Sequence, residues 1–296
     1  DGLARFDGQD FRIFRADKDK QNTLSHSNIF ALAIDQDGVL WVGTDGGGLN
    51  RYDAATESFK SFQYDENDPS SLSNDSVWSL YVDSKNQVWV GTRGGLNLLD
   101  RDTETFTAYQ HDEENPRSIA NDIILSIEET SDGTLWVGTR TGLSRLDAET
   151  NDFTNYYHNE ENPDSISDNQ VWDILEDSAG DLWLTTRYGG LNRMDRETET
   201  FEAFLHNEDD PTSISDNSVF HIYEDSRGTV WVATEKGGVN IFDRESKTFA
   251  RYQHDPNDDL TLSSDDIFWI MEDASGSIWF SSRRAGVNQY APAIQR

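Results

Sequence analysis

The chain has 296 residues, 35% of them hydrophobic and 11% aromatic, which is enough apolar material for a sizeable core. A formal charge of −32 repels nucleic-acid phosphates and anionic membrane surfaces, so we expect no nucleic-acid partner. The absence of cysteine excludes disulfides and thiolate metal sites. No run approaches the roughly 18 apolar residues of a membrane span, and no signal peptide is present. Because the sequence opens inside a repeat, at DGLARFD, we expect a piece of a longer protein.

A phrase close to LWVGT recurs along the chain at intervals of 47 or 48 residues. A segment such as SVWSLYVD precedes each copy, a segment such as GLNRYD follows it, and an aromatic pair such as FKSF comes next. Each repeat therefore predicts four short strands, A to D. The tryptophans of the phrase, which we expect to pack between repeats, are Trp41, Trp89, Trp136, Trp183, Trp231 and Trp279.

The connections between these strands have the residues of tight turns. Between A and B stand DQDG, TSDG and DSRG, where glycine supplies the positive φ of a hairpin. Between C and D stand DAATES and DRDTET, which begin with the Asp that type I turns favour. Strand B is a continuous apolar run, as expected of a strand covered on both faces.

These features predict an all-β fold, a β-propeller of four-stranded antiparallel blades, with residues 1–296 as one domain. Strands A, B and D each occur six times, whereas C occurs seven times. The seven are Gly2–Phe6, Gly48–Tyr52, Gly95–Leu99, Gly142–Leu146, Gly190–Met194, Gly238–Phe242 and Gly286–Tyr290. We favour six blades in a ring that the N-terminal strands close by completing the C-terminal blade. A seventh blade is the alternative.

The phrases LWVGTxxGGLNRxD and FxxFxHDxxNPxSLSxDxV, with loops such as NDPSSLSNDSV and ENPDSISDNQV, resemble the two-component regulator propeller repeat over essentially the whole chain. The resemblance implies a periplasmic sensor region of a bacterial histidine kinase or diguanylate cyclase. It also implies a β-sandwich domain, a membrane span and an output domain after the propeller; a homodimer of the full receptor is a further expectation. Thr185 and Ala233 replace the glycine of the phrase, and the last repeat reads WFSSRRAGVNQYAP, so we expect an irregular final blade.

The tips between strands B and C differ from repeat to repeat, as in TRGG, TRYGG and TEKGG. In a propeller these tips open on the same face as the long D-to-A loops. We call their basic residues the cationic rim: Arg93, Arg140, Arg187, Lys236, Arg283 and Arg284. Guanidinium groups pair well with carboxylate, sulfate and phosphate, so the rim is a candidate site for an anionic ligand. The alternative is that each cation neutralises the acidic loop beside it, as around Asp65 to Asp68.

A second variable position lies one residue before the fixed Leu or Ile of strand A. We call it the variable row: Ala31, Ser79, Ser126, Asp173, His221 and Trp269. Because strand A is innermost in a propeller blade, we expect this row to line the axial pocket; relaxed packing is the alternative. Just before it stand Phe30, Trp78, Trp172, Phe220 and Phe268, which we expect in the core. Any that reach the channel mouth would suit stacking on sugars.

Two further patterns suggest metals but fit them poorly. His111, His158, His206 and His254 occupy the same position in successive repeats, so the blades hold them apart and we expect structural roles. The loop DENDPSSLSND offers oxygen ligands yet lacks the glycine and terminal glutamate of an EF-hand loop. We therefore expect no metal and no cofactor, with calcium as the alternative.

No nucleophile elbow, phosphate-binding loop or zinc-protease motif occurs. We therefore expect a non-enzymatic, extracytoplasmic sensor propeller that recognises an acidic oligosaccharide or another anion. One alternative is a polysaccharide lyase or hydrolase that uses His221 with Arg187 or Lys236. Another is a scaffold whose loop face binds protein.

Overall fold

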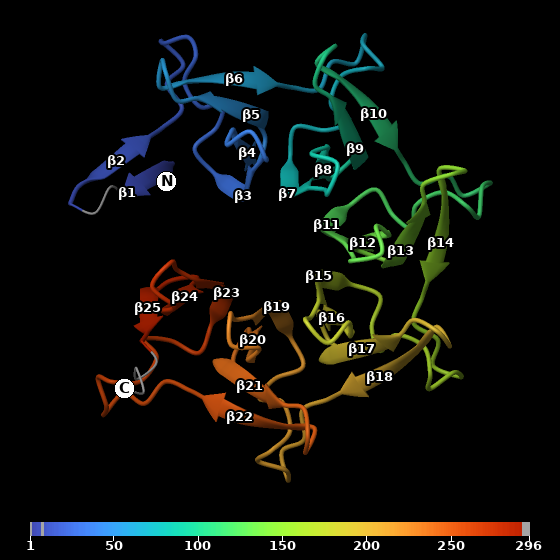
Figure 1. The fold of residues 1–296 in the computed structure, drawn as a ribbon, viewed down its shortest axis with the longest axis vertical. Helices are drawn as coiled ribbons and strands as arrows, with labels where there is room; N and C mark the ends of the chain where they lie inside the picture. The colour runs from blue at the N-terminus through green and yellow to red at the C-terminus, as the bar shows by residue number, and fades with distance from the viewer. Residues whose placement is uncertain (1, 7–8, 292–296) are drawn as a thin grey trace. The chain divides into compact units, whose positions relative to one another are not determined.

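The computed structural model describes residues 2–6 and 9–291, and the ordered elements there are β-strands joined by turns (Figure 1). Within these residues no helix is long and apolar enough to span a membrane.

The strands follow the order expected from the repeats, and their ends agree with the expected C strands to within one residue. The A strands are β3 (Ile29–Ile34), β7 (Val77–Val82), β11 (Ile124–Glu129), β15 (Val171–Glu176), β19 (Val219–Glu224) and β23 (Ile267–Glu272). The B strands are β4 (Leu40–Thr44), β8 (Val88–Thr92), β12 (Leu135–Thr139), β16 (Leu182–Thr186), β20 (Val230–Thr234) and β24 (Ile278–Ser282). The C strands are β1 (Leu3–Phe6), β5 (Gly48–Asp53), β9 (Gly95–Asp100), β13 (Gly142–Asp147), β17 (Leu191–Asp195), β21 (Val239–Asp243) and β25 (Gly286–Tyr290). The D strands are β2 (Phe11–Phe14), β6 (Ser58–Phe62), β10 (Thr105–Tyr109), β14 (Asp152–Tyr156), β18 (Thr200–Phe204) and β22 (Thr248–Tyr252).

Five antiparallel sheets contain the full A-B-C-D set, as in the order β3-β4-β5-β6. The strands β23-β24-β25 form a three-stranded sheet, and β1 pairs with β2 in a two-stranded sheet. The all-β fold class and its four-stranded antiparallel blades are therefore confirmed. The three-stranded final sheet agrees with the irregular last repeat. Completion of that sheet by the N-terminal strands stays a prediction.

The chain divides into two compact units. The first comprises Asp1–Arg140 and Ser144–Asn155, and the second comprises Thr141–Leu143 and Tyr156–Arg296. The first therefore holds β1 to β12 with most of β13 and β14, and the second holds β15 to β25. That residues 1–296 form one propeller domain stays a prediction from the repeats.

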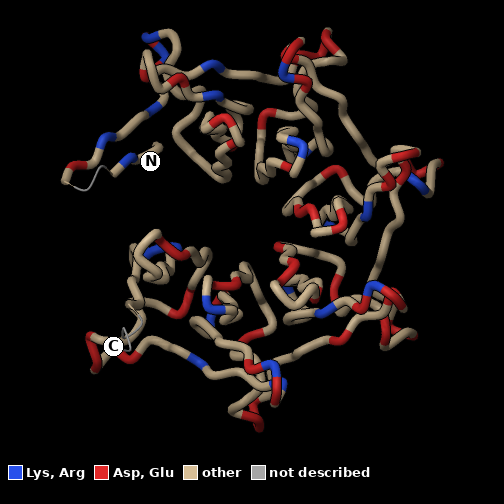
Figure 2. Tube along the Cα trace, viewed as in Figure 1, with Lys and Arg blue, Asp and Glu red and all other residues tan. Residues whose placement is uncertain are grey.

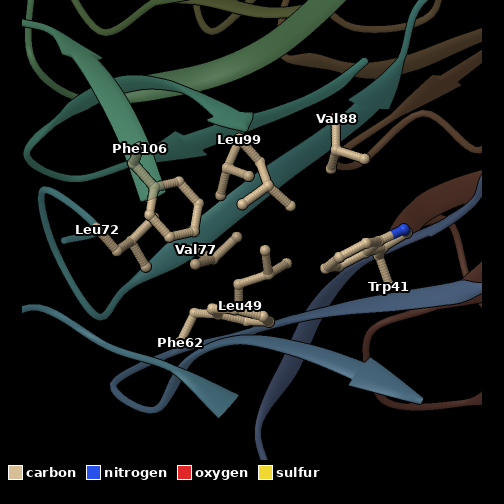
Figure 3. Close-up of a cluster of buried hydrophobic side chains, with 9 residues drawn as sticks. Trp41, Leu49, Phe62, Leu72, Val77, Val88, Leu99 and Phe106 are labelled. Carbon is tan, nitrogen blue, oxygen red and sulfur yellow. The ribbon is translucent and has the colours of Figure 1, made fainter. Parts of the chain in front are cut away.

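The repeat tryptophan of one blade packs into the core it shares with the next blade. In the first unit Trp41 and Leu49 lie against Val77, Val88 and Leu99 of the following sheet (Figure 3). The same packing holds for Trp89, Trp183 and Trp231, which confirms the prediction for these four residues. Trp136 is also buried, whereas Trp279 of the three-stranded sheet is only half-buried.

Each of these buried indoles needs an acceptor for its N–H group, because an unpaired donor in the core is costly. In five repeats an aspartate six residues earlier accepts from the indole Nε1, at 2.9 Å between Trp41 and Asp35 and 3.0 Å between Trp231 and Asp225. The remaining pairs of this kind are Trp89–Asp83, Trp183–Asp177 and Trp279–Asp273. The residue six positions before Trp136 is Thr130. A hydrogen bond from the indole to this aspartate thus links the A-to-B turn to strand B, and we did not predict this contact from the sequence.

Every A strand carries a β-bulge at its second residue. In β19, Val219 pairs with Thr234 and His221 pairs with Ala233, so Phe220 is the extra residue. The same register shift occurs in β3, β7, β11, β15 and β23. A bulge bends its strand and redirects side chains, so it sets the direction of the side chains at this end of each A strand.

Candidate functional site

The B-to-C tips and the D-to-A loops meet at one end of each sheet, as predicted. The carbonyl of Asp75 accepts hydrogen bonds from Gly46 N and Gly48 N, at 3.0 Å and 2.8 Å. The carbonyl of Asp122 accepts from Gly95 N in the same way, at 2.8 Å. Asp and Glu recur in the long loops that connect the blades (Figure 2). The cations of the tips therefore lie close to loops of opposite charge.

In the first unit the rim arginines are exposed and make no ion pair with other described residues. The guanidinium carbon of Arg93 lies 5.5 Å from the ring centroid of Trp78, a cation–π distance. Arg140 is exposed on the next tip. The alternative was that Arg93 neutralises the acidic loop around Asp65 to Asp68. Instead, Arg93 contacts the aromatic ring of Trp78.

In the second unit the rim is a mixed set of charges around one ring. The guanidinium carbons of Arg187 and Arg283 lie 5.4 Å and 5.3 Å from the centroid of Phe220. Arg187 also pairs with Glu235 at 3.2 Å, and Arg283 lies 3.9 Å from Asp266. Arg187 is therefore neutralised by an acid on the next B-to-C tip, whereas the acid near Arg283 belongs to a D-to-A loop, as the alternative predicted.

The other two rim cations are exposed, and within residues 2–6 and 9–291 they form no ion pair. They are Lys236 and Arg284.

The aromatic residues next to the variable row differ in burial. Phe220 is buried as predicted, and Trp78 and Trp172 are half-buried. The prediction is wrong for Phe30 and Phe268, which are 47% and 36% exposed. These two rings are covered on one side by a neighbouring ring, Phe30 by Trp78 and Phe268 by Phe220.

Each variable-row residue pairs across strands with the glycine position of the LWVGT phrase. In the first unit the pairs join small residues: Ala31–Gly43, Ser79–Gly91 and Ser126–Gly138. In the second unit both members are larger: Asp173–Thr185, His221–Ala233 and Trp269–Ser281. The repeats in which another residue replaces the glycine of LWVGT are therefore the repeats whose variable-row residue is Asp, His or Trp.

The second unit brings its three row residues together. His221 Nε2 lies 3.6 Å from Asp173 Oδ2, and the imidazole lies against the indole of Trp269, with 3.8 Å between centroids and 39° between ring planes. The Asp173 carboxylate also accepts from Ile222 N at 3.1 Å. His221 is buried, whereas 52% of Trp269 is exposed. Asp173, His221 and Trp269 therefore form a contiguous cluster, and its Trp269 edge is exposed to solvent.

Burial controls the ionisation of this cluster. Desolvation raises the pKa of Asp173 to about 7, although the hydrogen bond from Ile222 N opposes that shift. Desolvation lowers the pKa of His221 to about 3. Because one fifth of the Asp173 side chain is exposed, solvent moderates the first shift. Near pH 6 Asp173 is therefore protonated and the His221 imidazole is neutral, so the pair carries no net charge.

Several buried polar atoms on the variable row and on the facing B strands have no hydrogen-bond partner within residues 2–6 and 9–291. In the first unit they include Ser79 Oγ and Ser126 Oγ of the variable row. In the second unit they include His221 Nδ1 and Thr185 Oγ1. Buried polar atoms are normally satisfied, so a group without a protein partner indicates a bound water or a ligand.

The four repeat histidines each bond to their own loop. Nδ1 of His111 lies 2.8 Å from the Ile119 carbonyl oxygen, and Nδ1 of His206 lies 2.8 Å from that of Ile214. His158 and His254 repeat the contact. Among the residues that the structure describes, no three His, Asp or Glu side chains are grouped to share a metal ion. In the loop considered for calcium, Asp65 and Asp68 accept hydrogen bonds from their own turns.

Comparison with solved structures shows the fold. The extracellular domain of a hybrid two component system of Bacteroides thetaiotaomicron, BT3049, superposes with a TM-score of 0.68 at 22% identity. That match covers 90% of this chain and 40% of the other. The extracellular domain of the B. thetaiotaomicron system BT4673 is 25% identical, with a TM-score of 0.51 over 94% of this chain and 38% of the other. The chain thus spans about two fifths of the length of these proteins.

A virginiamycin B lyase from Staphylococcus aureus also matches, with a TM-score of 0.63 at 14% identity over 90% of this chain and 85% of the lyase. No curated protein sequence matches significantly. The model of the "Two component regulator propeller" family matches six times. Its matches cover residues 23–46, 71–94, 118–141, 165–188, 213–236 and 261–284. The chain is therefore built from six two component regulator propeller repeats.

Proposed function

We propose that the chain is a non-enzymatic, ligand-binding propeller in the extracytoplasmic sensor region of a bacterial signal-transduction receptor. The repeat family and the likeness to extracellular domains of two component systems support this assignment. Its ligand is an anion, with an acidic oligosaccharide as the leading class. The binding surface is the part of the cationic rim that lies in the first unit, Arg93 and Arg140.

The observation that carries the proposal is the contact between Arg93 and Trp78. An aromatic ring orients the exposed guanidinium, and no carboxylate among the described residues pairs with it. Its N–H donors are therefore free to form a bidentate contact with a carboxylate or sulfate. An oriented cation that lacks an anion in a chain of charge −32 is unlike an ordinary neutralised surface arginine.

The alternative of a lyase centred on His221 gains no support from this geometry. The His221 side chain contacts Asp173 and Trp269 and is only 7% exposed. A general base must reach the proton that it removes from a substrate.

Signalling requires the ligand to bind two receptor states with different affinity. The rim combines tips from successive blades with the loops that lead into the next blade, so a ligand there contacts more than one blade. We propose that occupancy changes how the propeller engages the β-sandwich domain that follows it in the receptor.

The test is calorimetric titration of the chain with oligogalacturonate and with a neutral oligosaccharide of equal length, at low and moderate salt. Anion binding that weakens with salt is expected, because screening acts on exposed charges. The double variant Arg93→Ala, Arg140→Ala should reduce affinity about tenfold or more.

The control Lys18→Ala, Lys85→Ala removes the same charge outside the rim and should leave binding unchanged. Equal losses in the two double variants would mean that net charge alone governs binding. Failure of the unmodified chain to bind the anion would refute recognition of this ligand class by the rim.

A further inference from the structure

We infer that Asp173, His221 and Trp269 form a separate subsite, within the second unit, for a primary ammonium group attached to a flat ring. The three side chains lie on the A strands of consecutive blades and touch in sequence, from carboxylate to imidazole to indole. The inference goes beyond the rim, whose ligand is anionic, and does not depend on it.

Asp173 supplies a carboxylate that no basic side chain neutralises permanently. Its ionic contact is with His221, and no Lys or Arg among the described residues pairs with it. Backbone donors, among them Ile222 N, satisfy part of its hydrogen-bonding capacity, and a carboxylate can accept further hydrogen bonds. About 19% of the side chain is exposed, so a ligand can reach it from solvent.

His221 supplies a second acceptor. Beside an ionised Asp173 carboxylate, the neutral tautomer with its proton on Nε2 is favoured, and this tautomer leaves a lone pair on Nδ1. That atom is buried and has no hydrogen-bond partner among the residues that the structure describes. In a residue that is 95% buried, a ring nitrogen without a partner among the described residues indicates a bound water or a ligand group beside it.

Trp269 supplies an open aromatic surface. The imidazole covers part of the indole, and 52% of the residue remains exposed. Indole is the best of the aromatic side chains for binding a cation over its face, and it also stacks on flat rings.

All three groups are electron-rich, so they favour a ligand that donates hydrogen bonds and carries positive charge. An ammonium group has three donors and a full charge, whereas a hydroxyl group has one donor and none. The formal charge of −32 adds a field that attracts cations. A ligand cation would also stabilise the ionised form of the Asp173 carboxylate against desolvation.

The first unit offers an internal comparison. The corresponding positions there are Ala31, Ser79 and Ser126, which have neither a carboxylate nor a ring. The same bulged strands therefore carry the ammonium-binding chemistry in the second unit alone. This difference argues against a role in the fold common to all blades.

The experiment compares benzylamine with benzyl alcohol and benzoate, which share its ring and differ in the polar group. Binding to the intact chain is followed by calorimetry and by the indole N–H signals in a two-dimensional NMR spectrum. Benzylamine should bind saturably and roughly tenfold or more tightly than either analogue, with the Trp269 signal shifting. Benzyl alcohol binding equally well would overturn the inference.

Asp173→Asn should weaken benzylamine binding roughly tenfold or more, and Glu208→Gln, which removes an exposed acid of the same unit, should not. Trp269→Leu provides a second variant whose folding is less at risk, since half of that side chain is exposed. Unchanged benzylamine affinity in folded Asp173→Asn or Trp269→Leu protein would contradict the assignment. So would the absence of saturable binding to the intact chain.

Discussion

Nε2 of His221 lies 3.6 Å from Oδ2 of Asp173, one repeat earlier on the neighbouring A strand. Burial favours the neutral form of each group, so the pair keeps one proton over a wide range of pH. The histidine has a pKa of about 3 and the aspartate a pKa of about 7 in the folded protein, against ordinary values of 6.5 and 3.8.

The first prediction is that this pair contributes almost no pH dependence to stability between about pH 4 and 6. In that window the folded pair holds one proton on Asp173, and the unfolded pair holds one proton on His221. Equal proton counts in the two states leave the free energy of unfolding independent of pH. Urea unfolding of the intact chain supplies the baseline.

Single variants should expose the two opposing slopes. In His221→Gln the remaining Asp173 binds a proton only in the folded state over this window, so the free energy of unfolding falls as pH rises. In Asp173→Asn the remaining His221 binds a proton only in the unfolded state, so the free energy of unfolding rises with pH. Each slope is at most about 1.4 kcal/mol per pH unit relative to the intact chain. Slopes of the same sign would show that the two groups are not coupled by burial in this way.

The second prediction concerns the aspartate that closes the A-to-B turn. Asp83 accepts hydrogen bonds from Lys85 N at 3.0 Å, from Gln87 N at 2.7 Å and from the indole of Trp89 at 2.9 Å. Asp83→Ala leaves a buried indole N–H without an acceptor and should lower the free energy of unfolding by about 2–4 kcal/mol. Chemical denaturation measures the change, with Asp102→Ala in an exposed turn as the control.

The repeat spacing predicted the strand order because each blade obeys local rules. Glycine at positive φ in the hairpins, as at Gly133 with φ 82°, and an apolar B strand can be recognised within one repeat. The contact between Trp89 and Asp83 also has a signal, since an aspartate stands six residues before the tryptophan in five repeats. A fixed offset between a polar residue and a buried ring could have revealed it.

The site could be predicted only as a set of positions. Variation along the row singled out Asp173, His221 and Trp269, yet their mutual contact depends on how adjacent A strands pack. The bulge at Phe220 was not foreseen, because one extra residue in a strand has no fixed sequence signature. Whether a rim arginine meets a carboxylate or a ring depends on side-chain positions in the neighbouring blade.

The third prediction separates the two kinds of rim arginine by stability. Arg187 pairs with Glu235 at 3.2 Å and donates to Ser218 Oγ at 3.3 Å, and less than a quarter of each charged side chain is exposed. Arg187→Ala should therefore lower the free energy of unfolding by about 1–2 kcal/mol, because it leaves the Glu235 carboxylate unpaired. Arg93→Ala should change it by less than about 0.5 kcal/mol. Thermal unfolding of both variants checks this; a larger loss for Arg93 would give that residue a structural role.

The fourth prediction tests why small residues fill the variable row in the first unit. A Cβ atom at Gly91 would lie 2.0 Å from Ser79 Oγ and 2.6 Å from Cγ2 of Ile124 in the next blade. The serine can rotate, but the β-branched isoleucine is stiff, so Gly91→Ala should lower the free energy of unfolding by about 1–3 kcal/mol.

The matched control lies at the same position of the fifth blade, where alanine is native and buried. Ala233→Gly removes a methyl group that this site already accommodates, so its loss in stability should be smaller, about 1 kcal/mol. The double variant Gly91→Ala, Ser79→Ala should recover part of the loss, and the recovered part measures the coupling across the strand pair. Tolerance of Gly91→Ala without any loss would mean that close packing does not explain why glycine accompanies the small row residues.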